Sequence, residues 1–352
     1  MKKSKGIVFL FPGQGAQYPG MGLDMAEVSA GAKEVFAAAS DILGLDLAAL
    51  IRDSDEETLK RTDISQPAIS AVSLAAAAFL KERGIVPGAC AGFSLGEYPA
   101  LVCASVISME DCFRLTKARG RAMQDAVNHI RDRITRNAAG GGAVDSGAED
   151  GCTTGGATDS GATAPPGMAA VLGLPSERVE ALIAEWKGTN SPLEDLYPAN
   201  INSPKQTVVS GSAAALEEAK KRFIEAGARR VLRLAVAGPF HSPFMKEAAE
   251  AFAPALEQTA FADPLIPLFS NVTGGQVSSG AEAKSLALRQ IVEGVRWIAE
   301  ERALAELKPE VVLETGPGSV LQGLWRDRGS EIPAYGAGTV KEIMEFLSEY
   351  SV

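Results

Sequence analysis

Ser94 lies between two glycines in the segment AGFSLGEYPAL, in the pattern G-x-S-x-G. A serine in this pattern can be a nucleophile on a sharp turn, because the flanking glycines let a strand and a helix approach closely. The residues before Ser94 predict a short strand, and those after it predict a helix whose first N–H groups favour developing negative charge. The same serine could be an ordinary helix N-cap, so the motif alone leaves both interpretations open.

A serine nucleophile needs a general base, and the chain has only two histidines, His129 and His241. His129 follows a predicted helix near Arg133, where we expect a solvated surface residue. His241 lies in AGPFHSPFM, directly after a predicted strand, and a loop at the end of a strand can position a base. His241 is therefore the candidate base for Ser94, and a buried core histidine is the alternative.

The first glycine-rich loop, FPGQGAQYPGMG, could supply hydrogen-bond donors to the same site. The backbone N–H of Gln14 could join that of Leu95 in an oxyanion hole, where the loss of one donor costs about 2.7–4 kcal/mol. A nucleotide-phosphate loop is the rival interpretation. It fails because the third glycine of G-x-G-x-x-G is absent after both Gly13 and Gly316.

Arg119 lies in KARGRAMQ, on a predicted helix that follows the Ser94 segment. Its planar guanidinium could bind a carboxylate through two parallel hydrogen bonds. Such a clamp would select acyl groups that end in a free carboxylate. A surface position or a structural ion pair is the alternative for a helix arginine.

Composition narrows the possible classes of protein. The 352 residues are 46% hydrophobic and 22% charged, as in ordinary globular proteins, and the net charge of −10 argues against nucleic-acid binding. The four cysteines lack C-x-x-C spacing and lie in no Cys/His cluster, so we expect reduced thiols and no metal site. The apolar run ending at Pro12 is too short for a signal peptide, and Ala68–Leu80 is too short to span a bilayer. We therefore expect a cytoplasmic protein without a membrane segment.

Strands that alternate with helices predict an α/β-hydrolase-like core with a parallel sheet, formed by residues 1–136 and 237–352. Residues 137–166 contain almost no large apolar side chain, so we predict a flexible Gly/Ala-rich insertion there. Residues 167–236 predict the order strand, helix, strand, strand, helix, strand. This order indicates a small ferredoxin-like subdomain that interrupts the core.

Taken together, these segments resemble the malonyl-CoA:acyl-carrier-protein transacylases and the acyltransferase domains of fatty acid and polyketide synthases. The matching segments cover nearly the whole chain in the family's order, apart from the insertion: FPGQGAQYPGMG, GFSLGEYPALVCA, KARGRAMQ, GMAAVLG, NINSPKQTVVSG, GPFHSPFM, SNVTG, LRQIVEGVRW and LETGPGSVLQGL. The resemblance implies transfer of a malonyl group from malonyl-CoA to the phosphopantetheine thiol of acyl carrier protein. Coenzyme A is then part of a substrate, no cofactor is required, and a monomer is expected.

The resemblance also implies a role for each candidate residue. Ser94 would take the malonyl group as an ester in a ping-pong cycle, while His241 would deprotonate Ser94 and then protonate the leaving thiol. Arg119 would hold the malonyl carboxylate. The main-chain carbonyl of Gln290, in LRQ, would orient His241, so no triad aspartate is needed. The two N–H groups named above would form the oxyanion hole.

Two aromatic residues bear on the choice of acyl group. Phe93 stands where the family usually has histidine, in GHSLGE, and it cannot donate a hydrogen bond. Its effect on rate and acyl preference is open. Phe240 directly precedes His241, as in malonyl-selective members of the family, and should crowd out an α-methyl branch.

An acidic carrier protein calls for local basic surface on this acidic chain. We hypothesise that the run KKRFIEAGARR in the small subdomain supplies it, although a solvated helix face is the alternative. The basic residues of this run are Lys220, Lys221, Arg222, Arg229 and Arg230.

Two rival functions stay open from the sequence. A serine hydrolase or thioesterase would form the same acyl serine but release it to water, and it would have no use for a carboxylate clamp at Arg119. A non-catalytic module that kept the fold is the second rival.

Overall fold

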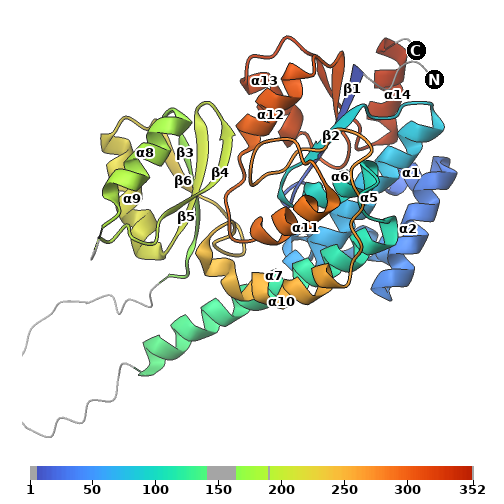
Figure 1. Cartoon of the computed structure of the whole chain (residues 1–352). Helices are drawn as coiled ribbons and strands as arrows, with labels where there is room; N and C mark the ends of the chain where they lie inside the picture. Colours follow the sequence, from blue (N-terminus) through green and yellow to red (C-terminus); the bar gives the residue numbers. More distant parts are fainter. Residues whose placement is uncertain (1–5, 141–163, 189–190, 351–352) are drawn as a thin grey trace, which may run out of the picture.

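The computed structural model of the chain describes residues 6–140, 164–188 and 191–350. They form a larger part built on a parallel sheet beside a smaller part built on an antiparallel sheet (Figure 1). The predicted insertion at 137–166 falls mostly outside the described residues. Residues 137–140 form the end of helix α7 (Met109–Gly140), and two of these four residues are alanines, which favour helix.

The larger part confirms the predicted parallel α/β sheet. Its strands are β1 (Ile7–Phe11), β2 (Ala89–Gly92), β7 (Val311–Glu314) and β8 (Ala334–Gly336), paired in parallel in the order β2-β1-β7-β8. Every residue of β1, β2 and β7 is buried. Strands covered on both faces are continuously apolar, which is why GIVFLF predicts one.

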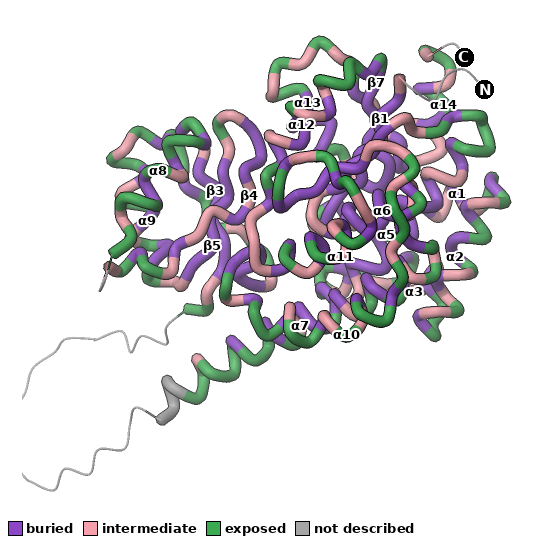
Figure 2. Tube along the Cα trace, viewed as in Figure 1, coloured by how far each residue is buried: buried purple, intermediate pink, exposed green. Residues whose placement is uncertain are grey.

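Helices surround this sheet, and Figure 2 shows the buried residues concentrated on the strands and on the inner helices α5 and α6. In chain order the helices of this part are α1 (Leu23–Val28), α2 (Ala30–Leu43), α3 (Leu47–Asp53), α4 (Glu56–Lys60), α5 (Thr62–Glu82), the 3₁₀ turn η2 (Ser94–Gly96), α6 (Glu97–Cys103), α7, the 3₁₀ turn η3 (Pro243–Met245), α10 (Lys246–Glu257), α11 (Gly280–Arg289), α12 (Trp297–Glu306), α13 (Val320–Asp327) and α14 (Val340–Glu349).

Helix α5 is longer than the apolar stretch that predicts it. Its 21 residues make it the one helix, within the described ranges, that is long and apolar enough by length and composition to cross a membrane. However, 78% of its apolar window is buried inside the protein, where it packs against α2 and α7. These contacts make α5 a central helix of the hydrophobic core.

The smaller part has the predicted order of elements. They are β3 (Gly167–Leu172), α8 (Ser176–Trp186), β4 (Tyr197–Ser203), β5 (Gln206–Gly211), α9 (Ala213–Glu225) and β6 (Arg230–Arg233). The strands pair antiparallel in the order β4-β5-β3-β6. Helices α8 and α9 pack on one face with a separate apolar cluster that includes Val209 and Phe223. The other face turns toward the parallel-sheet part (Figure 1).

Gly92 and Gly96 allow β2 and the following turn to approach β1 closely. A Cβ atom on Gly96 would lie 2.0 Å from the carbonyl oxygen of Phe11, and one on Gly92 would lie 2.0 Å from the carbonyl of Gly96. Backbone atoms cannot give way as a flexible side chain can. The pattern G-x-S-x-G is therefore required by packing here.

We predict that Gly96→Ala lowers the free energy of unfolding by more than about 2 kcal/mol, because its methyl group would overlap the Phe11 carbonyl. Gly323→Ala in α13 is the matched control, since nothing lies within 4 Å of the Cβ position there. It should stabilise the protein by about 0.5–1 kcal/mol. Thermal unfolding followed by calorimetry measures both variants, and equal transition temperatures would contradict the packing argument.

Candidate active site

Ser94 sits on a sharp turn between β2 and α6, in a strained backbone conformation. Its φ of 51° lies in the left-handed region, which is uncommon for a residue other than glycine. Its backbone is held on both sides: the N–H donates to Asn271 Oδ1 at 2.6 Å, and the carbonyl accepts from Gln290 Nε2 at 3.0 Å. Ser94 is thus a turn residue rather than a simple N-cap, and its side chain is left free to act.

His241 reaches Ser94 across 147 positions of the chain. The Ser94 Oγ and His241 Nε2 atoms are 2.8 Å apart. His241 Nδ1 lies 2.8 Å from the carbonyl of Gln290 and 3.2 Å from that of Glu293. Carbonyl oxygens only accept, so Nδ1 carries the proton and Nε2 is free to accept one from Ser94. Ser94 and His241 therefore lie within hydrogen-bond distance of each other. The main-chain carbonyl of Gln290 contacts Nδ1 of His241, the contact that the resemblance implies.

The surroundings of His241 keep its ring neutral. Burial and, to a lesser extent, the positive charge of Arg119 lower its pKa to about 4, although the two carbonyl hydrogen bonds act in the opposite direction. The imidazole is therefore uncharged near neutral pH. A neutral imidazole can serve as a proton acceptor.

Arg119 is buried beside the nucleophile and is not a surface residue. The residue is only 1% exposed, and its Nη2 donates to Gln290 Oε1 at 2.9 Å and to Ser94 Oγ at 3.3 Å. Its guanidinium lies over the Tyr98 ring, 5.6 Å from the centroid. Its Nε has no hydrogen-bond partner among the described residues. A buried cation with an unused donor is suited to an added anion.

A cleft of about 760 Å³ opens over these side chains, between the two parts of the protein. The antiparallel sheet contributes Met168, Asn200, Asn202 and Val208 to its wall. Six of the candidate site residues predicted from the sequence line this cleft: Gln14, Phe93, Ser94, Arg119, Phe240 and His241. Leu95 and Gln290 are buried beneath it. The eight candidates are therefore gathered around one site.

The loop after β1 lies against the turn that carries Ser94. A Cβ atom on Gly13 would come within 2.5 Å of the Phe93 carbonyl, so loop and turn are in close contact. The side-chain amide of Gln14 donates to Lys60 O at 3.3 Å and to Thr62 Oγ1 at 3.4 Å, which holds the loop in place. This arrangement brings the backbone of Gln14 to the edge of the cleft near Ser94.

The aromatic residue before the nucleophile packs on the core. The Phe93 ring meets Trp297 edge to face, with centroids 5.4 Å apart, and it also borders the cleft. Phe93 thus contributes packing where the family usually has a polar ring. Phe240 is buried and forms part of the cleft wall beside His241.

The part of the proposed basic patch that lies on α9 is away from the cleft. Lys221 and Arg222 on α9 pair with Glu218 at 3.8 and 2.9 Å. Helix α9 packs on the sheet face that carries Val209 of β5. The preceding residue of β5, Val208, lines the cleft. Successive residues of a strand point to opposite faces, so α9 and the cleft lie on opposite sides of this sheet.

A buried polar network below the turn escapes prediction from the sequence. Asn271 Nδ2 donates to Gly92 O at 2.6 Å and to Glu300 Oε1 at 2.8 Å. Gln290 Nε2 donates to Glu97 Oε2. Burial raises the pKa of Glu97 to about 7 and that of Glu300 well above its ordinary value. Asn271, Glu97 and Gln290 lie in the matching segments SNVTG, GFSLGEYPALVCA and LRQIVEGVRW, but nothing in these segments indicates that the three side chains form one network.

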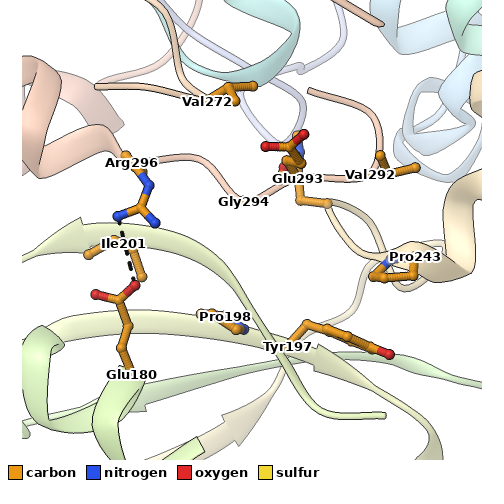
Figure 3. Close-up of a pocket in the computed structure, with 11 residues that line it drawn as sticks. Glu180, Tyr197, Pro198, Ile201, Pro243, Val272, Val292, Glu293, Gly294 and Arg296 are labelled. Carbon is orange, nitrogen blue, oxygen red and sulfur yellow. Dashed lines mark hydrogen bonds and ion pairs between the residues drawn. The ribbon is translucent and has the colours of Figure 1, made fainter. Parts of the chain in front are cut away.

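His241 also lines a second, smaller cavity of about 240 Å³. Figure 3 shows the other residues that line this cavity. It lies between β4 and the segment 292–296, and an ion pair of 3.9 Å joins Arg296 to Glu180 of α8 across it. The backbone of Val295 pairs with β4, donating to Ala199 O and accepting from Ile201 N, both at 2.8 Å. The segment that orients His241 is thus attached to the antiparallel sheet.

The remaining sequence expectations concern His129 and the cysteines. His129 is exposed, with Nδ1 3.3 Å from Glu247, as predicted for a surface residue. Cys90, Cys103 and Cys112 are free, and Cys152 lies outside the described residues. Within the described part of the chain, no group of three or more His, Cys, Asp or Glu residues is arranged to hold a metal ion.

Comparisons with known proteins identify the family of this chain. The family described as acyl transferase domain matches residues 8–190 and 162–342. A malonyl CoA-acyl carrier protein transacylase from Bacillus subtilis is 36% identical over 324 residues, which are 90% of this chain and 89% of that protein. The crystal structure of an acyl carrier protein S-malonyltransferase from Vibrio cholerae has a TM-score of 0.81 at 32% identity, covering 97% of this chain and 99% of that one. A malonyl-transacylase solved in complex with its type II PKS acyl-carrier protein has a TM-score of 0.81 at 33% identity, with the same coverage.

We predict that His241 stays neutral, with its proton on Nδ1, down to about pH 5, because burial and Arg119 hold its pKa at about 4. NMR titration can follow it cleanly, since His129→Gln removes the only other imidazole. Arg119→Gln should raise the pKa of His241, because a protonated ring would no longer be repelled by the guanidinium. A His241 that titrates near the ordinary 6.5 would contradict this description of the site.

Proposed function

This chain belongs to the acyl transferase family, and we propose that it transfers a malonyl group from malonyl-CoA to the phosphopantetheine thiol of an acyl carrier protein, through an ester on Ser94. The protein is an acyltransferase, as its malonyl CoA-acyl carrier protein transacylase relatives are. One observation carries the mechanism: the 2.8 Å contact between Ser94 Oγ and His241 Nε2, with the buried Arg119 guanidinium 3.3 Å from the same hydroxyl. A serine hydrolase is not favoured, because the relatives are transferases.

The first half of the reaction forms the ester. Ser94 Oγ attacks the thioester carbonyl carbon while His241 Nε2 takes the hydroxyl proton. The carbonyl oxygen becomes an oxyanion, which the N–H groups of Gln14 and Leu95 stabilise. The carbon–sulfur bond then breaks, and the coenzyme A thiolate receives the proton from Nε2. The Gln290 and Glu293 carbonyls favour the imidazolium formed in between, in the role that a triad aspartate plays elsewhere.

The second half reverses these steps with another thiol. His241 takes the proton of the phosphopantetheine thiol, whose sulfur attacks the ester carbonyl. The Ser94 oxygen leaves and recovers its proton from Nε2. Proton and acyl group are both conserved over the cycle, so the reaction needs no cofactor.

Acyl selection rests on three side chains that line the cleft. Arg119 binds the malonyl carboxylate with the guanidinium donors that face the cleft. Phe240 narrows the wall beside His241 against an α-methyl branch. Phe93 replaces a polar ring with an apolar one packed on Trp297, so it shapes the pocket without donating a hydrogen bond.

We extend the proposal to finer points of fold and context. The strand–turn–helix around Ser94 supports an α/β-hydrolase-like core formed by 1–136 and 237–352, and the order β4-β5-β3-β6 with both helices on one face supports a ferredoxin-like subdomain at 167–236. The family resemblance supports a monomer in the cytoplasm, and the burial of α5 supports the absence of a membrane segment.

Carrier-protein docking on the α9 patch is less well supported than docking at the mouth of the cleft, since α9 lies on the opposite side of the sheet.

We predict that malonyl-CoA labels the wild-type chain with one malonyl group, measured by intact mass, and that holo acyl carrier protein removes the label faster than water does. Ser94→Ala should abolish the adduct, and His241→Ala should slow its formation by about 10²–10⁴-fold. Ser105→Ala is the matched control, because Ser105 also has a left-handed backbone but is exposed outside the cleft. Release to water at the same rate as to the carrier thiol would favour the hydrolase, and no adduct would favour a non-catalytic module.

We further predict that Arg119→Ala lowers the preference for malonyl-CoA over acetyl-CoA by at least about 30-fold, the equivalent of roughly 2 kcal/mol for a lost buried charge pair. Competition between the two thioesters, read by adduct mass, gives the ratio directly. Arg121→Ala is the control two residues along, exposed and paired with Asp125 at 3.6 Å. Unchanged selectivity in Arg119→Ala would remove the clamp from the mechanism.

A further inference from the structure

Asn271 lies beside the end of β2, directly behind the nucleophile. The segment before it runs alongside that strand: Cys90 N donates to Pro267 O at 2.9 Å, and Phe269 N donates to Cys90 O at 3.2 Å. These bonds bring Asn271 level with the Ser94 turn, where it is 0% exposed. A buried amide at this point must satisfy its polar atoms within the protein.

The Asn271 amide bridges the two backbone groups on either side of Phe93. Oδ1 accepts from the Ser94 N–H at 2.6 Å, and Nδ2 donates to the Gly92 carbonyl at 2.6 Å. Because a carbonyl can only accept and an N–H can only donate, one orientation of the amide fits both. The side chain therefore clamps the turn on which the nucleophile sits.

Glu300 of α12 fixes the orientation of that clamp. Its Oε1 accepts from Asn271 Nδ2 at 2.8 Å, and the residue is fully buried. With Gly92 O, it uses both hydrogens of the amide nitrogen. A rotated amide would place its oxygen against the Gly92 carbonyl and would lose the present bond to Glu300 Oε1, so both partners favour the rotamer that receives the Ser94 N–H.

We propose that Asn271 is a positioning residue for this reaction: it holds Ser94 in its left-handed conformation through the Gly92–Ser94 bridge, in an orientation set by Glu300. The inference rests on the proposed function of Ser94 as the nucleophile. It also bears on the oxyanion hole. The Ser94 N–H is already bonded to Asn271, so it is not free to stabilise the oxyanion, and the task falls to neighbouring donors such as those of Gln14 and Leu95.

The backbone of Asn271 is anchored independently of its side chain. Its N–H donates to Glu97 Oε1 at 3.3 Å, and its carbonyl accepts from Arg296 N at 2.8 Å. A truncated side chain leaves these bonds in place. We therefore expect Asn271→Ala to fold while its nucleophile turn is loosened.

The first test measures the reactivity of Ser94 in Asn271→Ala. Labelling by a fluorophosphonate probe, which needs no malonyl group, should slow on the order of 10²-fold, because small misplacements of reacting atoms have effects of this size. With malonyl-CoA, kcat should fall similarly while KM changes by less than about twofold, since no substrate contact is removed. Wild-type labelling rates in a folded Asn271→Ala protein would overturn the proposal. A wild type that takes the probe but no malonyl group would instead overturn the proposed function.

A second set of variants separates positioning from general stability. In Asn271→Asp, a carboxylate oxygen replaces the donor and faces Glu300. Adding Glu300→Gln restores a donor to that pair, so the double variant should label at least about tenfold faster than Asn271→Asp alone. Glu301→Gln is the matched control on the same helix: Glu301 is buried and accepts from Trp297 Nε1 at 2.8 Å, and its substitution should not rescue Asn271→Asp. Equal labelling rates for the two folded double variants would overturn the role of Glu300 in the proposal.

Discussion

The hydrogen bond between Ser94 Oγ and His241 Nε2 depends on two backbones that are both held in an uncommon conformation. Ser94 has a φ of 51° and His241 a φ of 55°. Residues other than glycine persist there only when their surroundings determine them strongly. Around Ser94 this is achieved by the close packing of Gly92 and Gly96 and by the Asn271 amide. At His241, two carbonyl acceptors from a distant segment orient the imidazole ring.

That distant segment also joins the two parts of the protein. Gln290 and Glu293 orient the base, and two residues later Val295 forms two backbone hydrogen bonds with β4. The ion pair between Glu180 and Arg296 contributes little to the stability of this contact, because both side chains are partly exposed. The main-chain bonds therefore align the antiparallel sheet, which supplies one wall of the cleft, with the imidazole that works inside it.

The reactive pair could be predicted from the sequence because its signals are local and few. A strand–turn–helix pattern with flanking glycines identifies Ser94 as the candidate nucleophile. The chain has only two histidines, and His241 is the one that directly follows a predicted strand, so it is the candidate base. The supporting network could not be predicted in this way. Residue types such as Asn, Gln and Glu are usually exposed, so Asn271, Glu97 and Glu300 look like surface residues until tertiary contacts bury them. The burial of Arg119 could not be predicted either, because no local sequence pattern indicates it. The position of α9 on the sheet face opposite the cleft also depends on tertiary contacts. Helix α5 extends beyond both ends of the apolar stretch Ala68–Leu80 because a helix can continue past its apolar residues.

The charges buried at the site couple acyl recognition to the strength of the base. Arg119 carries a charge in the core, and its nearest acidic neighbour in the network, Glu97, has a pKa raised to about 7 by burial, so its charge compensates the guanidinium incompletely at neutral pH. The uncompensated guanidinium is one reason why the pKa of His241 is low. In the proposed reaction the malonyl carboxylate would sit on Arg119 and cancel this repulsion, which would raise the pKa of His241 at the moment when it must accept the Ser94 proton. An acetyl group brings no such charge. Arg119 would then favour a malonyl group over an acetyl group in two ways. It would bind the carboxylate, and the bound carboxylate would make His241 a stronger base.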